Sequence, residues 1–307
     1  MDWNKAIRYG QLVNAAYDVF AGKAPVTPGY DVLATVFAND LATEARRKRG
    51  LPTAIVPIAL ILQSQSGGEA VVAIRGTMGV KEWLQDAKFA MEPFTPVADA
   101  GNTEIGFTDV YRSMTAGQGG GAQPIVKSLA IIPWRQSVTS LVICGHSLGG
   151  ALATLLALDT AAHAPAPFNH PVVYTYASPR TGDGKFAKRY GQLVTATFRI
   201  VDNVDVVPQF PAEPPYKHVT PRIKLDSLTL IPPRVRLQPN PVCWHVMQSY
   251  LYLMSLAAGG TVLKPDPECA PSAFLKDFLK HLCEDVRTLE GLVGEFAASP
   301  RSSLGGN

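Results

Sequence analysis

Hydrophobic and polar positions follow a helical rhythm at the start of the chain. Between residues 3 and 20 the apolar side chains recur every three or four positions, at Tyr9, Leu12, Val13, Ala16, Tyr17 and Phe20. This spacing places them on one face and predicts an amphipathic helix over 3–20.

Two runs rich in β-branched residues come next, TAIVPIALILQ at 53–63 and EAVVAIRG at 69–76. They are joined by Ser66-Gly67-Gly68 and predict a β-hairpin. Because proline cannot donate a ladder hydrogen bond, Pro57 predicts that the first of these strands lies at an edge of the sheet.

A glycine-rich break interrupts the apolar stretch LVICGHSLGGALATLLALD at 141–159. The residues before it predict a buried strand and those after it a buried helix. A reversal this sharp requires small residues two positions before and two after its apex, and Gly145 and Gly149 stand there with Ser147 between them. The pattern predicts a nucleophile elbow, G-x-S-x-G, which presents the serine hydroxyl at a helix N-terminus. The alternative is a turn whose serine only caps the helix.

Further strands are predicted by HPVVYTYASPR at 170–180 and VTATFRIV at 194–201. Strands that alternate with helices indicate an α/β fold with a mostly parallel central sheet and helices on both faces. The glycine-rich segment 118–124 predicts a flexible loop, and the proline-rich segment 208–241 an irregular excursion over the surface.

The end of the chain has a different character after PDPECAPS at 265–272. Leucine and valine recur in a 4-3-4-3-4 spacing from Leu275 to Val293, which predicts one apolar stripe on a charged helix. We therefore expect a single domain over 1–265 and a C-terminal helical extension with a flexible tail over 266–307. The stripe is expected to pack on the domain surface, with a homodimer seam as the alternative.

The composition is that of a globular protein, with 47% hydrophobic and 17% charged residues among 307. A formal charge of +3 is too small to indicate a nucleic-acid partner. Cys144 is expected to be a buried free thiol in the elbow strand. Cys243, Cys269 and Cys283 lack metal-ligand spacing, and whether they form a disulfide stays open. No signal peptide is visible at the N-terminus, which leaves the compartment open between a cytoplasmic and a secreted mature form.

A nucleophilic serine needs a base, an orienting acid and an oxyanion hole. After such an elbow the acid and then the histidine follow in the sequence. The order leaves His218 and His245 as bases, together with His281 in the predicted tail helix. Asp205 follows a predicted strand at its carboxyl end, where sites of α/β sheets are built, and Asp202 is its rival.

Six blocks carry a family resemblance: RGTMGVKEWLQDAKF, GFTDVY, CGHSLGGALA, YTYASPRTGDGKFA, RIVDNVDVVPQFP and WHVMQSYLYL. In order and approximate spacing they resemble the class 3 lipases, the fungal-lipase-like triacylglycerol lipases with their plant phospholipase A1 relatives. The resemblance extends from about Tyr17 to Leu253. It implies an α/β-hydrolase fold with a lid segment.

The resemblance implies a catalytic role for three residues. Ser147 falls on the nucleophile, Asp205 rather than Asp202 on the acid, and His245 on the base. His218 falls on a non-catalytic histidine near the site.

Other roles follow from the same resemblance. The oxyanion hole falls on Thr77 and on the backbone N–H of Leu148, and Asp86 on an acid that orients Thr77. The apolar segment after Thr77 falls on the lid, with Val80, Trp83 and Leu84.

Together these residues imply a serine carboxylic-ester hydrolase, foremost a triacylglycerol lipase that works through an acyl-enzyme without metal or cofactor. Its partners would be an acylglycerol or other lipid ester and, transiently, a lipid interface. The alternatives are a phospholipase A1, a feruloyl-type esterase for bulky acyl groups, and a catalytically silent scaffold. The silent scaffold is disfavoured because residues of the required types stand at all three triad positions.

Overall fold

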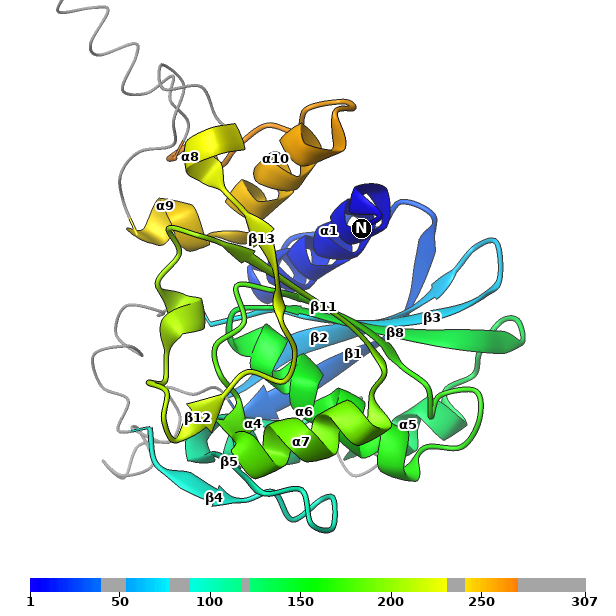
Figure 1. Ribbon diagram of the computed structural model, residues 1–307. Coiled ribbons are helices and arrows are strands. Elements are labelled where there is room, and N and C mark those ends of the chain that lie inside the picture. The colour runs from blue at the N-terminus through cyan, green and yellow to red at the C-terminus, as the bar shows by residue number, and fades with distance from the viewer. Residues whose placement is uncertain (40–53, 78–88, 117–121, 231–240, 270–307) are drawn as a thin grey trace, which may run out of the picture.

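A single large sheet forms the centre of the computed structural model, which describes residues 1–39, 54–77, 89–116, 122–230 and 241–269 (Figure 1). In these residues the sheet has nine strands in the order β13-β11-β9-β8-β3-β2-β1-β6-β7. Their bounds are β1 Tyr30–Asn39, β2 Ile55–Ser64, β3 Gly68–Ile74, β6 Thr115–Ala116, β7 Gln123–Pro124, β8 Val138–His146, β9 Val172–Tyr176, β11 Ala196–Asp202 and β13 Arg222–Leu225. The strands from β3 to β13 are parallel, and those from β3 to β7 pair antiparallel.

Helices cover both faces of this sheet (Figure 1). One face carries α1 (Trp3–Phe20) and α10 (Met247–Ala258); the other carries α4 (Ile105–Ser113), α5 (Ile125–Ile131), α6 (Leu148–His163) and α7 (Gly184–Leu193). Each face has its own apolar core. The predicted α/β architecture is therefore confirmed, including the first helix and the hairpin of β2 and β3.

Smaller elements complete the described chain. A second sheet has the order β12-β10-β5-β4. Its strands and the remaining short helices are β4 Met91–Pro93, β5 Asn102–Glu104, β10 Gly182–Asp183, β12 Tyr216–Lys217, η2 Val207–Gln209, α8 Ser227–Leu230 and α9 Pro241–His245. Among the described helices, none is both long and apolar enough to cross a membrane.

Helices α1 and α10 approach closely, although they come from opposite ends of the described chain. A Cβ on Gly10 of α1 would lie 2.7 Å from the Met247 side chain and 2.9 Å from that of Leu251. Asn14 donates to Gln248 at 2.9 Å across the same contact. Glycine at position 10 thus lets the two helices close over one face of the sheet.

The expected edge position of Pro57 is wrong, because β2 lies between β1 and β3. Pro57 pairs with Phe37 of β1, directly beside a register shift at Val36 and Phe37. A bulge interrupts the regular ladder there, and an interior strand tolerates proline at such a position.

Two segments expected to be irregular contain regular structure. Within 208–241, β13 extends the sheet in parallel with β11, and its Leu225 is buried. Within 118–124, Gln123 and Pro124 form β7, which pairs with β6. Both strands are short and contain proline or lie near it. Neither therefore shows the two-residue alternation of apolar and polar positions by which a strand is identified.

A disulfide anchors the end of the described chain to the domain. Cys243 and Cys269 form a disulfide, and Cys269 is buried. The chain therefore stays attached to the domain slightly beyond the expected boundary at 265. Cys144 is a buried free thiol, as predicted. The predicted helix over 275–293 and Cys283 lie outside the described residues.

Candidate active site

The turn between β8 and α6 has the geometry of the predicted elbow. Ser147 adopts φ +56° and ψ −126°, and its N–H donates to the Tyr176 carbonyl at 2.9 Å. A Cβ on Gly145 would lie 2.0 Å from the Gly149 carbonyl oxygen, and one on Gly149 would lie 2.3 Å from that of Ile74. Only glycine fits at these positions. The Ser147 hydroxyl makes no helix-capping hydrogen bond, so the capping alternative is wrong.

Three predicted residues from separate parts of the chain form one hydrogen-bonded row. Ser147 Oγ lies 2.8 Å from His245 Nε2. His245 Nδ1 lies 2.9 Å from Asp205 Oδ2 and 3.1 Å from Oδ1. Since Nδ1–H donates to the carboxylate, Nε2 is left as an acceptor for the serine hydroxyl. All three side chains are buried.

Further donors hold the Asp205 carboxylate in place. The Tyr250 hydroxyl donates to Oδ2 at 2.8 Å, and the Val207 N–H donates to Oδ1 at 3.0 Å. Burial, and then the Asp205 charge, raise the pKa of Tyr250, so it remains a donor. Each carboxylate oxygen thus accepts from a group other than His245, which fixes the acid in its orientation toward the imidazole.

Asp202 and His218 do not join this row. Asp202 is fully buried and accepts from the Ser227 N–H at 3.0 Å, and burial raises its pKa to about 6. His218 donates through Nε2 to the Pro208 carbonyl at 2.8 Å. Burial, and then the Arg199 charge, lower the pKa of His218 to about 3, so its imidazole is neutral.

Sequence reasoning missed a second row, which runs from α1 to the backbone of His245. The Tyr17 hydroxyl accepts from the Gly76 N–H at 2.8 Å and pairs with His146 Nδ1 at 2.8 Å. His146 Nε2 lies 2.7 Å from the His245 carbonyl. Since that carbonyl only accepts, His146 carries its proton on Nε2 and accepts the Tyr17 O–H on Nδ1. Burial, and then His245, lower the pKa of His146 well below its usual value.

Leu148 and the residue before Thr77 lie beside Ser147. Leu148 is the first residue of α6, so its N–H is at a helix N-terminus. A Cβ on Gly76 would lie only 2.8 Å from the Ser147 Cβ, which places the residue before Thr77 directly against the serine. Thr77 itself is half-buried. Asp86, Val80, Trp83 and Leu84 lie outside the described residues.

The arrangement supports nucleophilic catalysis by Ser147. His245 can take a proton from the Ser147 hydroxyl while Asp205 stabilises the resulting imidazolium. Among the described residues, no cluster of three or more histidine, cysteine, aspartate or glutamate side chains has the geometry to hold a metal ion.

Comparison with known proteins identifies relatives that are similar in sequence. The family model described as Lipase (class 3) matches residues 71–214. Phospholipase A1-II 6 of Oryza sativa subsp. japonica is 30% identical over 214 residues, covering 62% of this chain and 52% of the relative. Secreted mono- and diacylglycerol lipase 1 of Fusarium solani is 30% identical over 170 residues, covering 55% and 47%. The chain thus spans about half the length of these two relatives.

Solved structures show the same fold. The crystal structure of a lipase from Rhizopus microsporus var. chinensis superposes with a TM-score of 0.54 at 23% identity, covering 73% of this chain and 74% of that one. The family match and the shared fold agree, and this chain is similar to the class 3 lipases over residues 71–214.

Proposed function

We propose that the protein is a serine carboxylic-ester hydrolase that cleaves acylglycerols through an acyl-enzyme. The observation that carries this proposal is the continuous row from Ser147 Oγ through His245 to Asp205, at 2.8 Å and 2.9 Å. A serine is nucleophilic only when a base accepts its proton, and this geometry supplies that base.

The reaction follows from the positions of the groups. His245 Nε2 accepts the Ser147 proton as Oγ attacks the ester carbonyl carbon, and Asp205 stabilises the imidazolium. The backbone N–H groups of Leu148 and Thr77 stabilise the tetrahedral oxyanion. His245 then protonates the leaving alcohol, and the acyl-enzyme forms. Water, deprotonated by His245, releases the acid in the second half of the cycle.

Relatives support two substrate classes. One is named a mono- and diacylglycerol lipase and another a phospholipase A1. We favour acylglycerols and retain phospholipase A1 activity as the second candidate, because several relatives carry that name. A feruloyl-type esterase is the third. A lid that contains Val80, Trp83 and Leu84, with transient contact to a lipid interface, belongs to the proposal, as does a homodimer through residues 275–293.

The test uses purified wild-type protein and Ser147→Ala. A fluorophosphonate probe should label the wild type and leave the variant unlabelled, because only an activated serine reacts. Ser147→Ala should lose about 10⁴-fold or more in kcat with an unchanged fold by circular dichroism. Labelling of neither protein would indicate a silent scaffold. A panel of acylglycerols, phosphatidylcholine and feruloyl esters, each dissolved and emulsified, then ranks the substrates.

A further inference from the structure

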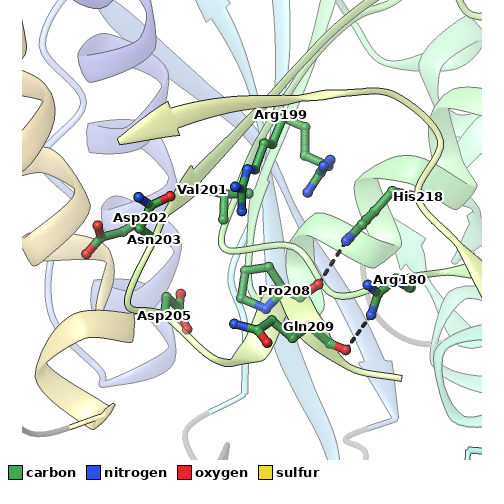
Figure 2. A pocket seen from close by; sticks show the side chains of 10 residues that line it. Arg180, Arg199, Val201, Asp202, Asn203, Asp205, Pro208, Gln209 and His218 are labelled. Carbon is green, nitrogen blue, oxygen red and sulfur yellow. Dashed lines mark hydrogen bonds between the residues drawn. The ribbon is translucent and has the colours of Figure 1, made fainter. Parts of the chain in front are cut away.

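Three arginines converge on a small cavity beside the Asp205 loop (Figure 2). The cavity has a volume of about 110 Å³, and its wall includes Arg180, Arg199, Arg222 and His218 as well as the carboxyl groups of Asp202 and Asp205. A water molecule takes up about 30 Å³ in the liquid. The space therefore holds a small polyatomic ion or a few waters.

The positions of Arg199 and Arg222 are unusual for a sheet. They are direct partners in the parallel ladder between β11 and β13. Like charges placed directly opposite each other on neighbouring strands destabilise a sheet. Arg199 is also buried, with an exposed fraction of 7%, whereas Arg222 is exposed at the rim.

Three guanidinium groups line the cavity against two carboxyl groups, Asp202 and Asp205, and the Asp205 carboxylate already accepts from His245. Within the described part of the chain, Arg199 donates through Nε to the Thr220 carbonyl at 3.0 Å and makes no ion pair. Arg180 has Glu213 at 3.4 Å, on a half-exposed side chain. Burial, and then Arg222 and Arg180, lower the pKa of Arg199 to about 10. Buried charges in proteins are normally paired, so the walls of the cavity are suited to an anion.

We propose that this cavity binds a phosphate group, held between the guanidinium groups of Arg199, Arg222 and Arg180. Planar guanidinium groups recognise phosphate oxygens through two parallel hydrogen bonds, and three of them face one small space. The phosphate comes either from free inorganic phosphate or from a lipid headgroup.

The site is coupled to the loop that carries the proposed catalytic acid. Arg180 donates to the carbonyls of Gln209 and, at 2.9 Å, Pro211. His218 donates to that of Pro208. All three carbonyls belong to the segment that follows Asp205. A bound phosphate would neutralise the arginines without displacing these hydrogen bonds and would stabilise the loop.

The experiment measures binding and therefore does not depend on the proposed hydrolase activity. Sodium phosphate is titrated into wild-type protein by calorimetry at constant ionic strength set with sodium chloride. We expect one site per chain and a rise in Tm with phosphate concentration, since a ligand that binds the folded state stabilises it. Arg222→Gln, at an exposed position outside the catalytic row, should weaken binding about tenfold through loss of charge-assisted hydrogen bonds.

Lys188→Gln is the matched control, because it removes the same charge from an exposed position on α7 that does not line the cavity. It should bind phosphate like the wild type. sn-Glycerol 3-phosphate in place of phosphate distinguishes the sources: equal or tighter binding indicates a lipid headgroup, and binding of inorganic phosphate alone indicates the free ion. Identical Tm values in phosphate and chloride, or equal affinity in wild type and Arg222→Gln, would overturn the proposal.

Discussion

The Tyr250 hydroxyl donates to Asp205 Oδ2 at 2.8 Å, the same carboxylate oxygen that accepts from His245 at 2.9 Å. The tyrosine oxygen also accepts from the Asp202 N–H at 3.0 Å. One hydroxyl on α10 therefore links the proposed catalytic acid to the end of β11.

Tyr250→Phe should lower kcat about tenfold with little change in KM, because Asp205 loses one of the donors that fix it toward His245. The buried Asp202 N–H also loses its partner, at a cost of about 1–3 kcal/mol in the free energy of unfolding. Tyr252→Phe, two residues further along α10, serves as the control, since its hydroxyl makes no hydrogen bond within the described ranges. Ester-hydrolysis kinetics and urea unfolding measure both effects. Unchanged kcat in Tyr250→Phe would remove Tyr250 from the site.

Tyr17→Phe tests the second hydrogen-bonded row. Without the hydroxyl, the Gly76 N–H and His146 Nδ1 both lose their partner, so the segment before Thr77 and the backbone of His245 lose a common support. We expect kcat to fall about tenfold, consistent with the loss of buried hydrogen bonds near the reacting groups. Tyr9→Phe is the matched control, because that tyrosine lies on the same helix and pairs with Glu69 instead. A similar loss in both variants would indicate a general effect on α1.

Substitutions of the two histidines considered as the base, His245 and His218, should differ clearly in their effect on kcat. His245→Ala should match Ser147→Ala, with a loss in kcat of about 10⁴-fold or more, because both belong to one catalytic unit. His218→Ala loses a hydrogen bond to the Pro208 carbonyl and should retain most of the activity. Steady-state kinetics on one soluble ester measure kcat in both variants. The reverse order of effects would make His218 the base.

Replacement of Asp202 by asparagine should stabilise the protein, by an amount that depends on pH. Burial raises its pKa from 3.8 to about 6, so ionisation is penalised in the folded state above pH 6, and the penalty is absent below pH 3.8. Since one pKa unit corresponds to about 1.4 kcal/mol, Asp202→Asn should stabilise the protein at pH 8 by on the order of 2 kcal/mol. The gain should shrink as the pH falls through 6 and disappear near pH 4. Urea unfolding at both pH values measures it.

Asp226→Asn provides the comparison for this measurement. Asp226 pairs with Lys224, and the hydrogen bond from that lysine lowers the pKa of the carboxyl. Its substitution should therefore give no gain at pH 8. A gain in Asp202→Asn that is equal at pH 4 and pH 8 would exclude burial of the charge as its cause.

Trp83→Ala tests the proposed lid. A tryptophan on the apolar face of a lid is stabilised at a lipid–water boundary, so its loss should reduce hydrolysis of emulsified glycerides more than that of dissolved short esters. The ratio of the two rates in wild type and variant is the measurement. Equal losses on both substrates would indicate a packing role, and a wild type with no preference for emulsions would indicate an esterase.

The parts of the site that the sequence predicts are those under local constraint. Gly145 and Gly149 are fixed by atoms within a few residues of the turn or on the adjacent strand, so the elbow is visible in a short motif. Asp205 and His245 could be selected because triad order and a family resemblance reduce the choices. Neither argument requires the distances between these side chains in the folded protein.

The parts that the sequence does not predict depend on contacts between distant segments. The pairing of Tyr17 with His146 joins residues 129 positions apart, and Tyr17 itself fits the apolar stripe of its helix. Arg199 and Arg222 become neighbours only through the register of a short strand. The edge position predicted from Pro57 is wrong because a bulge in the pairing of β2 with β1 accommodates the proline. The β2 sequence alone does not reveal that bulge.

The closure of α1 against α10 sets the order in which a growing polypeptide can mature. Asn14 and Gln248, which join the two helices, are 234 residues apart. At a synthesis rate of about 5–20 residues per second, α1 emerges from the ribosome roughly 10 to 50 s before its partner. During that interval the face of α1 around Gly10 has no α10 to cover it, and Ser147 has no His245. The catalytic row therefore stays incomplete until α9 has been translated, and the face of α1 stays without its partner until α10 follows.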